Sequence, residues 1–200
     1  MIACLEPFSS SHCSLSRRQL PKITHRVFFD VSVQGEGDIG RIVLGLFGEN
    51  SPAAVQQFVE LCSCEQKPCF TDSLFHRIIP YFGLQGGDIT HHDGTGGVPL
   101  SAPLEMKETV KMTKPHLLAV ATKGTTSATA TSQFFITTVK TQWLTGKHVV
   151  LGMVLEGGEE VVNVIEKGAG TYGGTPSHTV TITQSGVLPL EDKDAEPHYY

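Results

Sequence analysis

The sequence predicts a mainly β protein, in which eight antiparallel strands close into a β-barrel capped by two α-helices. Three observations support this fold class. The strand-like apolar segments are short and separated by turn residues. The two helical patterns lie far apart, so strands do not alternate with helices as in a doubly wound parallel sheet. The 200 residues are 40% hydrophobic and 18% charged, which suits one domain with a real core. Closure into a barrel would leave no exposed strand edges.

The strands are predicted from short runs rich in β-branched and aromatic residues, several of which alternate with polar residues. Glycine-rich segments at 34–38, 90–103 and 124–131 are predicted to be turns or surface loops. The expected strands, in chain order, are 27–33, 41–47, 74–79, 82–85, 117–122, 133–139, 149–155 and 178–184.

Two segments carry helical patterns. Ser51 and Pro52 are typical of a helix start, because serine is a good N-cap and proline is tolerated at the first helical position. Apolar residues then recur on one helical face, namely Val55, Phe58, Val59 and Cys62. The second helix is expected over 158–167, with Val161, Val164 and Ile165 on one side.

The chain divides into a flexible, serine-rich extension (1–22), a folded domain (23–188) and an acidic tail (189–200). We expect a cytoplasmic protein, with a mitochondrial or other organellar location as the alternative if residues 1–22 are a transit peptide. No apolar run approaches the ~20 residues needed to span a membrane, and no basic stripe indicates a nucleic-acid partner.

Five cysteines without a clear signal peptide indicate a reducing compartment. Cys62, Cys64 and Cys69 could be read as a zinc or redox cluster, but they have no nearby histidine and a structural zinc site needs four ligands. We therefore expect no metal and no cofactor. The three cysteines are expected to act as small apolar residues at a helix end and in a loop.

The segment 75–88 contains an arginine within an apolar run. If Arg77 is buried it needs partners, because an unpaired buried charge costs several kcal/mol. Alternatively, its guanidinium reaches solvent or pairs with Asp88. Pro80 ends the first strand, and Phe82 and Gln85 follow in the second. One hairpin could therefore present a guanidinium, an aromatic ring and an amide together.

Two stretches carry a family resemblance. Phe-His-Arg-Ile-Ile-Pro at 75–80, with Phe82 and Gln-Gly-Gly-Asp at 85–88, resembles the signature of the cyclophilins, the cyclosporin-binding peptidyl-prolyl isomerases. Ser-Gln-Phe-Phe-Ile at 132–136 and Trp-Leu-Thr-Gly-Lys-His-Val-Val at 143–150 are similar to the family's second block. The similarity runs from about Val27 to Leu188 and implies the same eight-stranded barrel.

The resemblance implies an enzyme that accelerates rotation about X-Pro bonds in proline-containing polypeptides and assists protein folding. It also implies cyclosporin binding, and we expect a monomer. The implied catalytic residues are Arg77, Phe82, Gln85, Phe135, Leu144 and His148. The implied groove for the flanking peptide contains Gly94, Ala121, Thr122, Lys123, Gln133 and Trp143.

The physical chemistry suggests what some of these residues would do. A guanidinium is a protonated fork of donors, so Arg77 would donate to the proline nitrogen as the amide twists. His148 would close the pocket edge rather than act as a base, because isomerisation transfers no proton. A purely structural histidine at the start of a strand is the alternative.

Four positions depart from the family pattern: Tyr81 replaces a glycine, Gly83 a methionine, and Thr122 and Lys123 an asparagine and an alanine. The alternative function is therefore a non-catalytic module that binds proline peptides with an altered rim. A hydrolase is disfavoured, since the chain lacks a Gly-x-Ser-x-Gly nucleophile motif.

Overall fold

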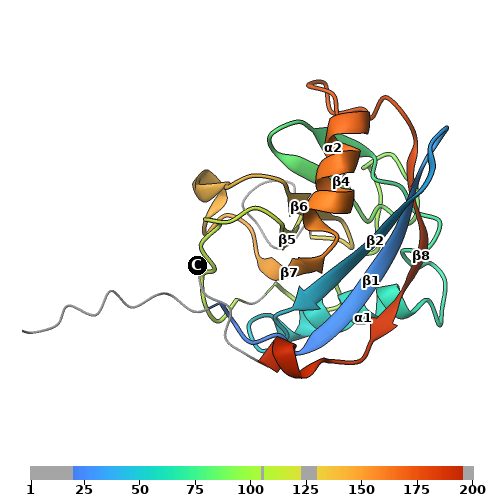
Figure 1. Cartoon of the computed structure of the whole chain (residues 1–200). Helices are drawn as coiled ribbons and strands as arrows, with labels where there is room; N and C mark the ends of the chain where they lie inside the picture. The colour runs from blue at the N-terminus through green and yellow to red at the C-terminus, as the bar shows by residue number, and fades with distance from the viewer. Residues whose placement is uncertain (1–19, 105, 123–129, 196–200) are drawn as a thin grey trace, which may run out of the picture.

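The structure, a computed structural model, describes residues 20–104, 106–122 and 130–195 (Figure 1). Its strands form one antiparallel sheet in the order β3-β4-β6-β5-β7-β2-β1-β8. The strands are β1 His25–Val33, β2 Gly37–Leu46, β3 Arg77–Ile79, β4 Gly83–Gly86, β5 Leu117–Val120, β6 Phe134–Thr137, β7 Val150–Glu156 and β8 Val180–Leu188.

The sheet curls until its two edge strands approach one another. The chain just before β3 meets β8, where the N–H groups of Asp72 and Phe75 donate to the carbonyl oxygens of Ile182 and Val180. Leu74 and Thr181 form an isolated antiparallel bridge at the same place. The predicted eight-stranded antiparallel fold is thus confirmed, and its two edges meet through this short bridge instead of a long ladder.

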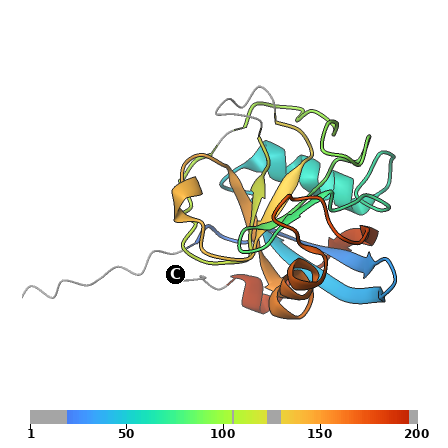
Figure 2. The same ribbon diagram turned by 90° about the horizontal axis from the view of Figure 1, so that it is seen from above.

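Two helices cover opposite ends of the curled sheet (Figures 1 and 2). Helix α1, Pro52–Ser63, agrees with the prediction, although the side chain of its N-cap residue Ser51 makes no capping hydrogen bond. The second predicted helix begins as a π-type turn, η3 Gly158–Val162, and continues as α2 Asn163–Ala169. Two short 3-10 turns, η2 Gln142–Leu144 and η4 Asp192–Ala195, were not expected. In the described part of the chain, no helix has both the length and the apolar character to cross a membrane.

The barrel interior is packed around phenylalanine rings. Phe29 of β1, Phe58 of α1, Phe134 of β6 and Phe70 meet with ring centroids 4.9–6.1 Å apart. Since side chains alternate along a strand, the neighbours of these inward residues face outward. Phe135 accordingly belongs to a second apolar cluster, which includes Phe47, Met112 and Leu117.

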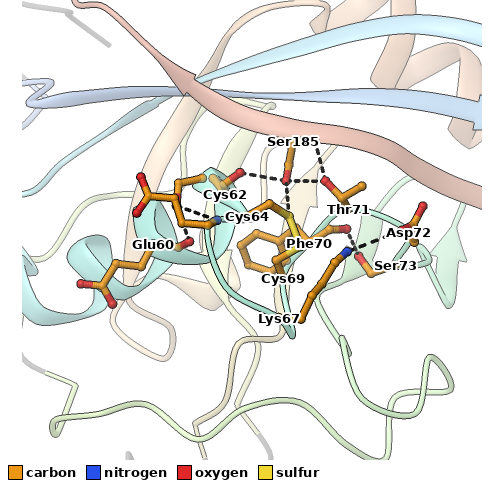
Figure 3. The surroundings of a disulfide bond; sticks show 12 residues. Glu60, Cys62, Cys64, Lys67, Cys69, Phe70, Thr71, Asp72, Ser73 and Ser185 are labelled. Carbon is orange, nitrogen blue, oxygen red and sulfur yellow. Dashed lines mark hydrogen bonds and ion pairs between the residues drawn. A yellow bond between two sulfur atoms is a disulfide. The ribbon is translucent and has the colours of Figure 1, made fainter.

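A disulfide corrects the prediction for the cysteines. Cys64 and Cys69 are bonded, with Cα atoms 5.2 Å apart, across the loop that leaves α1 (Figure 3). Ser185 of β8 ties this loop to the barrel, because its hydroxyl donates to the Cys62 carbonyl oxygen at 2.9 Å. Cys62 itself is a free, buried thiol. It fits the expected apolar role, whereas Cys64 and Cys69 do not.

The two ends of the described chain lie against the barrel. Leu20 and Ile23 are buried in the second apolar cluster. Residues 1–19, on which most of the predicted extension and the transit alternative rest, lie outside the described residues. Near the other end, the buried Arg26 forms ion pairs with Glu156, Glu191 and Asp194.

Candidate active site

The sheet register places four predicted or neighbouring positions in one row on the outer face of the barrel. Arg77 of β3 lies opposite Gln85 of β4, Gln85 opposite Phe135 of β6, and Phe135 opposite Ala119 of β5. Their neighbours Ile78, Leu84, Phe134, Ile136 and Leu118 point into the core. Alternation along the strands therefore brings residues from two distant motifs onto one surface.

Arg77 is exposed, which agrees with the alternative that its guanidinium reaches solvent. Its Nη1 atom donates to Gln85 Oε1 at 3.4 Å, a long hydrogen bond. Its guanidinium carbon lies 5.9 Å from the centre of the Phe82 ring. Arg77 is not paired with Asp88, since that carboxylate is buried and accepts other hydrogen bonds. The guanidinium is thus accessible to a ligand while one amide and one ring constrain it.

Aromatic side chains form an apolar surface beside this guanidinium. The Phe82 and Phe135 rings are stacked, with centroids 5.9 Å apart. His148 contacts the Phe135 ring edge-on at 5.1 Å, and its Nδ1 atom lies 3.1 Å from the carbonyl oxygen of Val120. Leu144 packs against the same cluster as Phe135. Direct contacts therefore connect five of the six residues that were predicted to be catalytic, and the sixth, Leu144, packs against the cluster that contains Phe135.

A chain of side-chain amides connects Arg77 to a loop. Gln85 Nε2 donates to Gln133 Oε1 at 3.1 Å. Gln133 is 5% exposed, and its Nε2 atom donates to the carbonyl oxygens of Gly94 at 3.0 Å and Gly96 at 2.8 Å. The carbonyl oxygen of Gly94 therefore fixes the amide of Gln133, and the amide of Gln133 in turn holds Gln85 in place.

Asp88 organises that loop, a role that the sequence analysis missed. Its carboxylate is buried and accepts hydrogen bonds from backbone N–H groups between Thr90 and Gly96. Burial by itself raises the pKa of Asp88, but hydrogen bonds from the N–H groups of His91, Gly96, Thr90 and Gly94 outweigh it and hold the pKa well below its usual range. An aspartate directly before a loop rich in threonine and glycine is the signal that could have indicated this.

His76 lies beneath the same loop. Both ring nitrogens are buried and have no hydrogen-bond partner among the described residues. A Cβ atom at Gly94 would lie 2.9 Å from the imidazole, so ring and loop are in close contact. Burial lowers the pKa of His76, and the nearby Asp88 and Asp93 oppose that effect only in part. The imidazole therefore favours its neutral form.

A cavity of about 120 Å³ opens beside Gln85 and Gln133. Ala121 and Thr122, both predicted groove residues, line it, together with three residues that were not predicted: Thr95, Gly96 and Thr131. Trp143 is 57% exposed on η2. Lys123 falls outside the described residues, so its predicted position in the groove stays a prediction.

Among the described residues, one group offers metal-ligand atoms close together, namely Asp88, His91 and Asp93. Both carboxylate oxygens of Asp88 already accept backbone hydrogen bonds. The cluster is therefore explained by the folding of the loop.

The backbone accounts for the departure at 83 but not for the one at 81. A Cβ atom at Gly83 would collide with the carbonyl oxygen of Ile136, so no larger residue fits this backbone. The carbonyl oxygen of Ile79 accepts a hydrogen bond from Phe82 N–H at 3.2 Å, which closes a turn with Pro80 and Tyr81 at its centre. Tyr81 has φ +60°, where glycine is favoured and another residue costs about 1–2 kcal/mol.

Comparison with known proteins agrees with this geometry. The family model described as "Cyclophilin type peptidyl-prolyl cis-trans isomerase/CLD" matches residues 28–187. The chain belongs to this cyclophilin-type family. The match contains β2 to β7, most of β1 and β8, and both stretches that form the outer-face row.

Relatives from yeast and a plant match most of this cyclophilin-type chain. It is 45% identical over 181 residues to peptidyl-prolyl cis-trans isomerase D of Saccharomyces cerevisiae, covering 88% of this chain and 79% of the relative. It is 43% identical over 182 residues to peptidyl-prolyl cis-trans isomerase CYP21-1 of Arabidopsis thaliana, covering 88% of this chain and 80% of the relative. The E3 SUMO-protein ligase RanBP2 of Pan troglodytes is 40% identical over 186 residues, which are 92% of this chain but 6% of that protein.

Proposed function

We propose that this protein accelerates cis–trans rotation about X-Pro bonds in polypeptides and thereby assists their folding. The observation that carries the proposal is the Arg77 guanidinium, which lies beside the Phe82 ring and is hydrogen-bonded to Gln85. The stacked Phe82 and Phe135 rings offer an apolar seat for a proline ring. Guanidinium and seat together are what this reaction requires.

The reaction requires no nucleophile, because no covalent bond breaks. The barrier to rotation is about 20 kcal/mol, which corresponds to roughly one event per hundred seconds. A turnover near ~10³ s⁻¹ requires the barrier to fall by about 6–7 kcal/mol. The protein must therefore stabilise the twisted amide more than the planar one.

Arg77 is placed to supply that difference. In the twisted amide, the proline nitrogen becomes pyramidal and gains a lone pair. An N–H group of Arg77 can donate to that lone pair, and this interaction is weaker in the planar state. The bound substrate would also remove water from the exposed guanidinium, and this strengthens the hydrogen bond. The amides of Gln85 and Gln133 keep the fork oriented, while His148 borders the seat without transferring a proton.

The seat and the adjoining cavity also support binding of a cyclosporin-type macrocycle. Such a ligand would place apolar side chains against Phe82, Phe135 and the exposed Trp143, and backbone amides against Gln133. Isothermal titration with cyclosporin A tests this part of the proposal, and a Trp143→Ala variant is expected to bind more weakly.

The first test compares the wild-type protein with Arg77→Ala and Arg77→Lys on a proline tetrapeptide. We expect Arg77→Ala to reduce kcat/KM by about 10²–10³-fold, the loss typical of one transition-state donor. Arg77→Lys should recover only part of the rate, because it restores the charge but not the fork. Cis–trans exchange measured by NMR gives the rates, and equal rates for wild type and Arg77→Ala would overturn the role of Arg77.

A second candidate is a module that binds proline peptides without catalysis. The absence of a side chain at Gly83 and the exposed Tyr81 favour it, because both alter the wall of the seat. Exchange spectroscopy on a bound peptide separates the two functions. The module predicts shifted peptide resonances without accelerated exchange, whereas the enzyme predicts both.

A further inference from the structure

Two exposed tyrosines project from neighbouring turns next to Arg77. Tyr81 is 73% exposed and Tyr172 is 82% exposed, the largest values among the exposed large hydrophobic residues of the described chain. Large aromatic side chains gain free energy by leaving water, so two of them in adjoining turns form an unusual surface. We call Tyr81 and Tyr172 the tyrosine rim.

Hydrogen bonds fix the two turns side by side. Thr171 N–H donates to the Ile78 carbonyl oxygen at 3.1 Å, and Ile78 N–H donates to the Gly174 carbonyl oxygen at 2.8 Å. The turn that carries Tyr172 is closed by a hydrogen bond from Gly174 N–H to Thr171 O at 3.0 Å. This turn therefore pairs with β3, the strand that leads directly into the turn of Tyr81.

The stem of Arg77 adjoins the turn of Tyr172. A Cβ atom at Gly174 would lie 3.1 Å from Arg77 Cγ, so a larger residue would press on the arginine. On the other side, Tyr81 directly precedes Phe82, whose ring lies by the guanidinium. The two turns that carry the tyrosine rim thus adjoin the proposed seat for the proline ring.

The backbone of Tyr81 provides a separate argument. Its φ of +60° occupies the turn position that favours glycine, yet its side chain is exposed and its hydroxyl has no hydrogen-bond partner within the described residues. The described residues thus give this side chain no hydrogen bond that would offset the unfavourable conformation. Strained residues of this kind cluster at binding and catalytic sites.

We propose that the tyrosine rim binds an apolar side chain of the substrate polypeptide, next to the isomerised proline, and so determines sequence preference. This inference rests on the proposed function. The cavity beside Gln133 lies at the far end of the β3–β4 hairpin from the turn of Tyr81. An extended peptide seated at Phe82 can therefore place one flank in the cavity and the other over the tyrosines.

The test uses tetra- and pentapeptides that are identical except for phenylalanine or alanine at one or two positions before or after the proline. On one of the two flanks, wild type is expected to prefer phenylalanine by about 5-fold in kcat/KM, the gain typical of an aromatic contact. Tyr81→Gly, which suits the backbone, and Tyr172→Ala should each bring this ratio close to one. Tyr81→Phe and Tyr172→Phe should keep it, because the rings remain.

Val187→Ala is the matched control, because Val187 is an exposed apolar residue of β8. It should keep the wild-type ratio. The proposal is overturned if both tyrosine variants retain the phenylalanine preference, or if they weaken all peptides equally. It is also overturned if sedimentation shows that the two tyrosines instead hold a dimer of this chain together.

Dissociation constants of the same peptides, from NMR titration, separate this inference from the proposed function. If wild type binds peptides but does not accelerate exchange, the isomerase proposal fails. In that case, loss of the phenylalanine preference in Kd in Tyr81→Gly and Tyr172→Ala supports the proposal for the tyrosine rim. If both variants keep that preference, the proposal is overturned.

Discussion

At the scale of single residues, the lowered pKa of His76 has a direct consequence for stability. Its ring nitrogens are buried without hydrogen-bond partners in the described part of the chain, and its imidazole contacts the loop at Gly94. Burial lowers its pKa below the usual value of 6.5, while the carboxylates of Asp88 and Asp93 act against the shift and Arg77 adds to it. In the unfolded chain the same imidazole takes up its proton more readily.

Because the unfolded state binds the proton more tightly, the stabilising contribution of a neutral His76 is present above pH 6.5 and is lost as the pH falls below it. We expect the free energy of unfolding to rise as the pH is raised toward 6.5 and to level off above that value. His76→Gln should reduce this slope. Urea unfolding at several pH values measures it.

His178→Gln is the control for this prediction, since His178 is exposed. It should leave the slope as in wild type. An unchanged slope in His76→Gln would contradict the role assigned to His76.

The residues of the row on the outer face were predictable because their motifs are long and their strands alternate. Arg77, Gln85 and Phe135 lie together as expected. Whether Arg77 is buried or exposed was not predictable in the same way, because an apolar run does not show which face of a strand meets the core. Asp88 was missed since its partners are backbone N–H groups, which no side-chain pattern displays.

At the scale of elements, the loop after α1 is closed by the Cys64–Cys69 disulfide. A cross-link over so short a loop is expected to contribute about 2 kcal/mol to stability by restricting the unfolded chain. The loop leads into Phe70, whose buried ring packs on Phe58 and Phe134. Opening the cross-link should therefore loosen the connection between helix and core without removing a core side chain.

We predict that the double variant Cys64→Ala, Cys69→Ala unfolds at a lower urea concentration than wild type. Its free energy of unfolding should be lower by about 2 kcal/mol. A reductant should shift wild type in the same direction and leave the double variant unchanged. Urea unfolding with and without dithiothreitol provides the measurement. Identical wild-type curves under both conditions would show that the bond contributes nothing.

The strands and helices were predicted well because each has its own apolar period. The π-type turn at 158–162 was not, because its apolar positions also fit an α-helix. The bond between Cys64 and Cys69 was missed for a different reason. Spacing alone does not distinguish two thiols from a disulfide, and the inference of a reducing compartment argued against the bond.

At the scale of the whole molecule, Arg26 connects the first strand to the end of the described chain. Its side chain is 5% exposed, and its guanidinium pairs with Glu156 of β7, Glu191 and Asp194. Asp194 is 2% exposed, and its Oδ2 atom lies 3.9 Å from Arg26 Nε. Lys193 also contacts Glu156 and Glu191, at 3.3 and 2.9 Å.

Arg26→Met is expected to lower the free energy of unfolding by about 3–5 kcal/mol, because it leaves a buried carboxylate without a counter-charge. The additional change Asp194→Leu should recover part of the loss, and urea unfolding measures both. Arg41→Met is the matched control: Arg41 and Asp30 form a more exposed pair at 2.7 Å, for which about 1 kcal/mol or less is expected. Equal losses for the two arginine variants would contradict this account.

The covalent link between Cys64 and Cys69 has a consequence for proteolysis. Glu65 is exposed and lies inside the ring that the bond closes. If a glutamate-specific protease cuts after Glu65, the two products stay joined through sulfur. They migrate as one band on a non-reducing gel and as two after reduction.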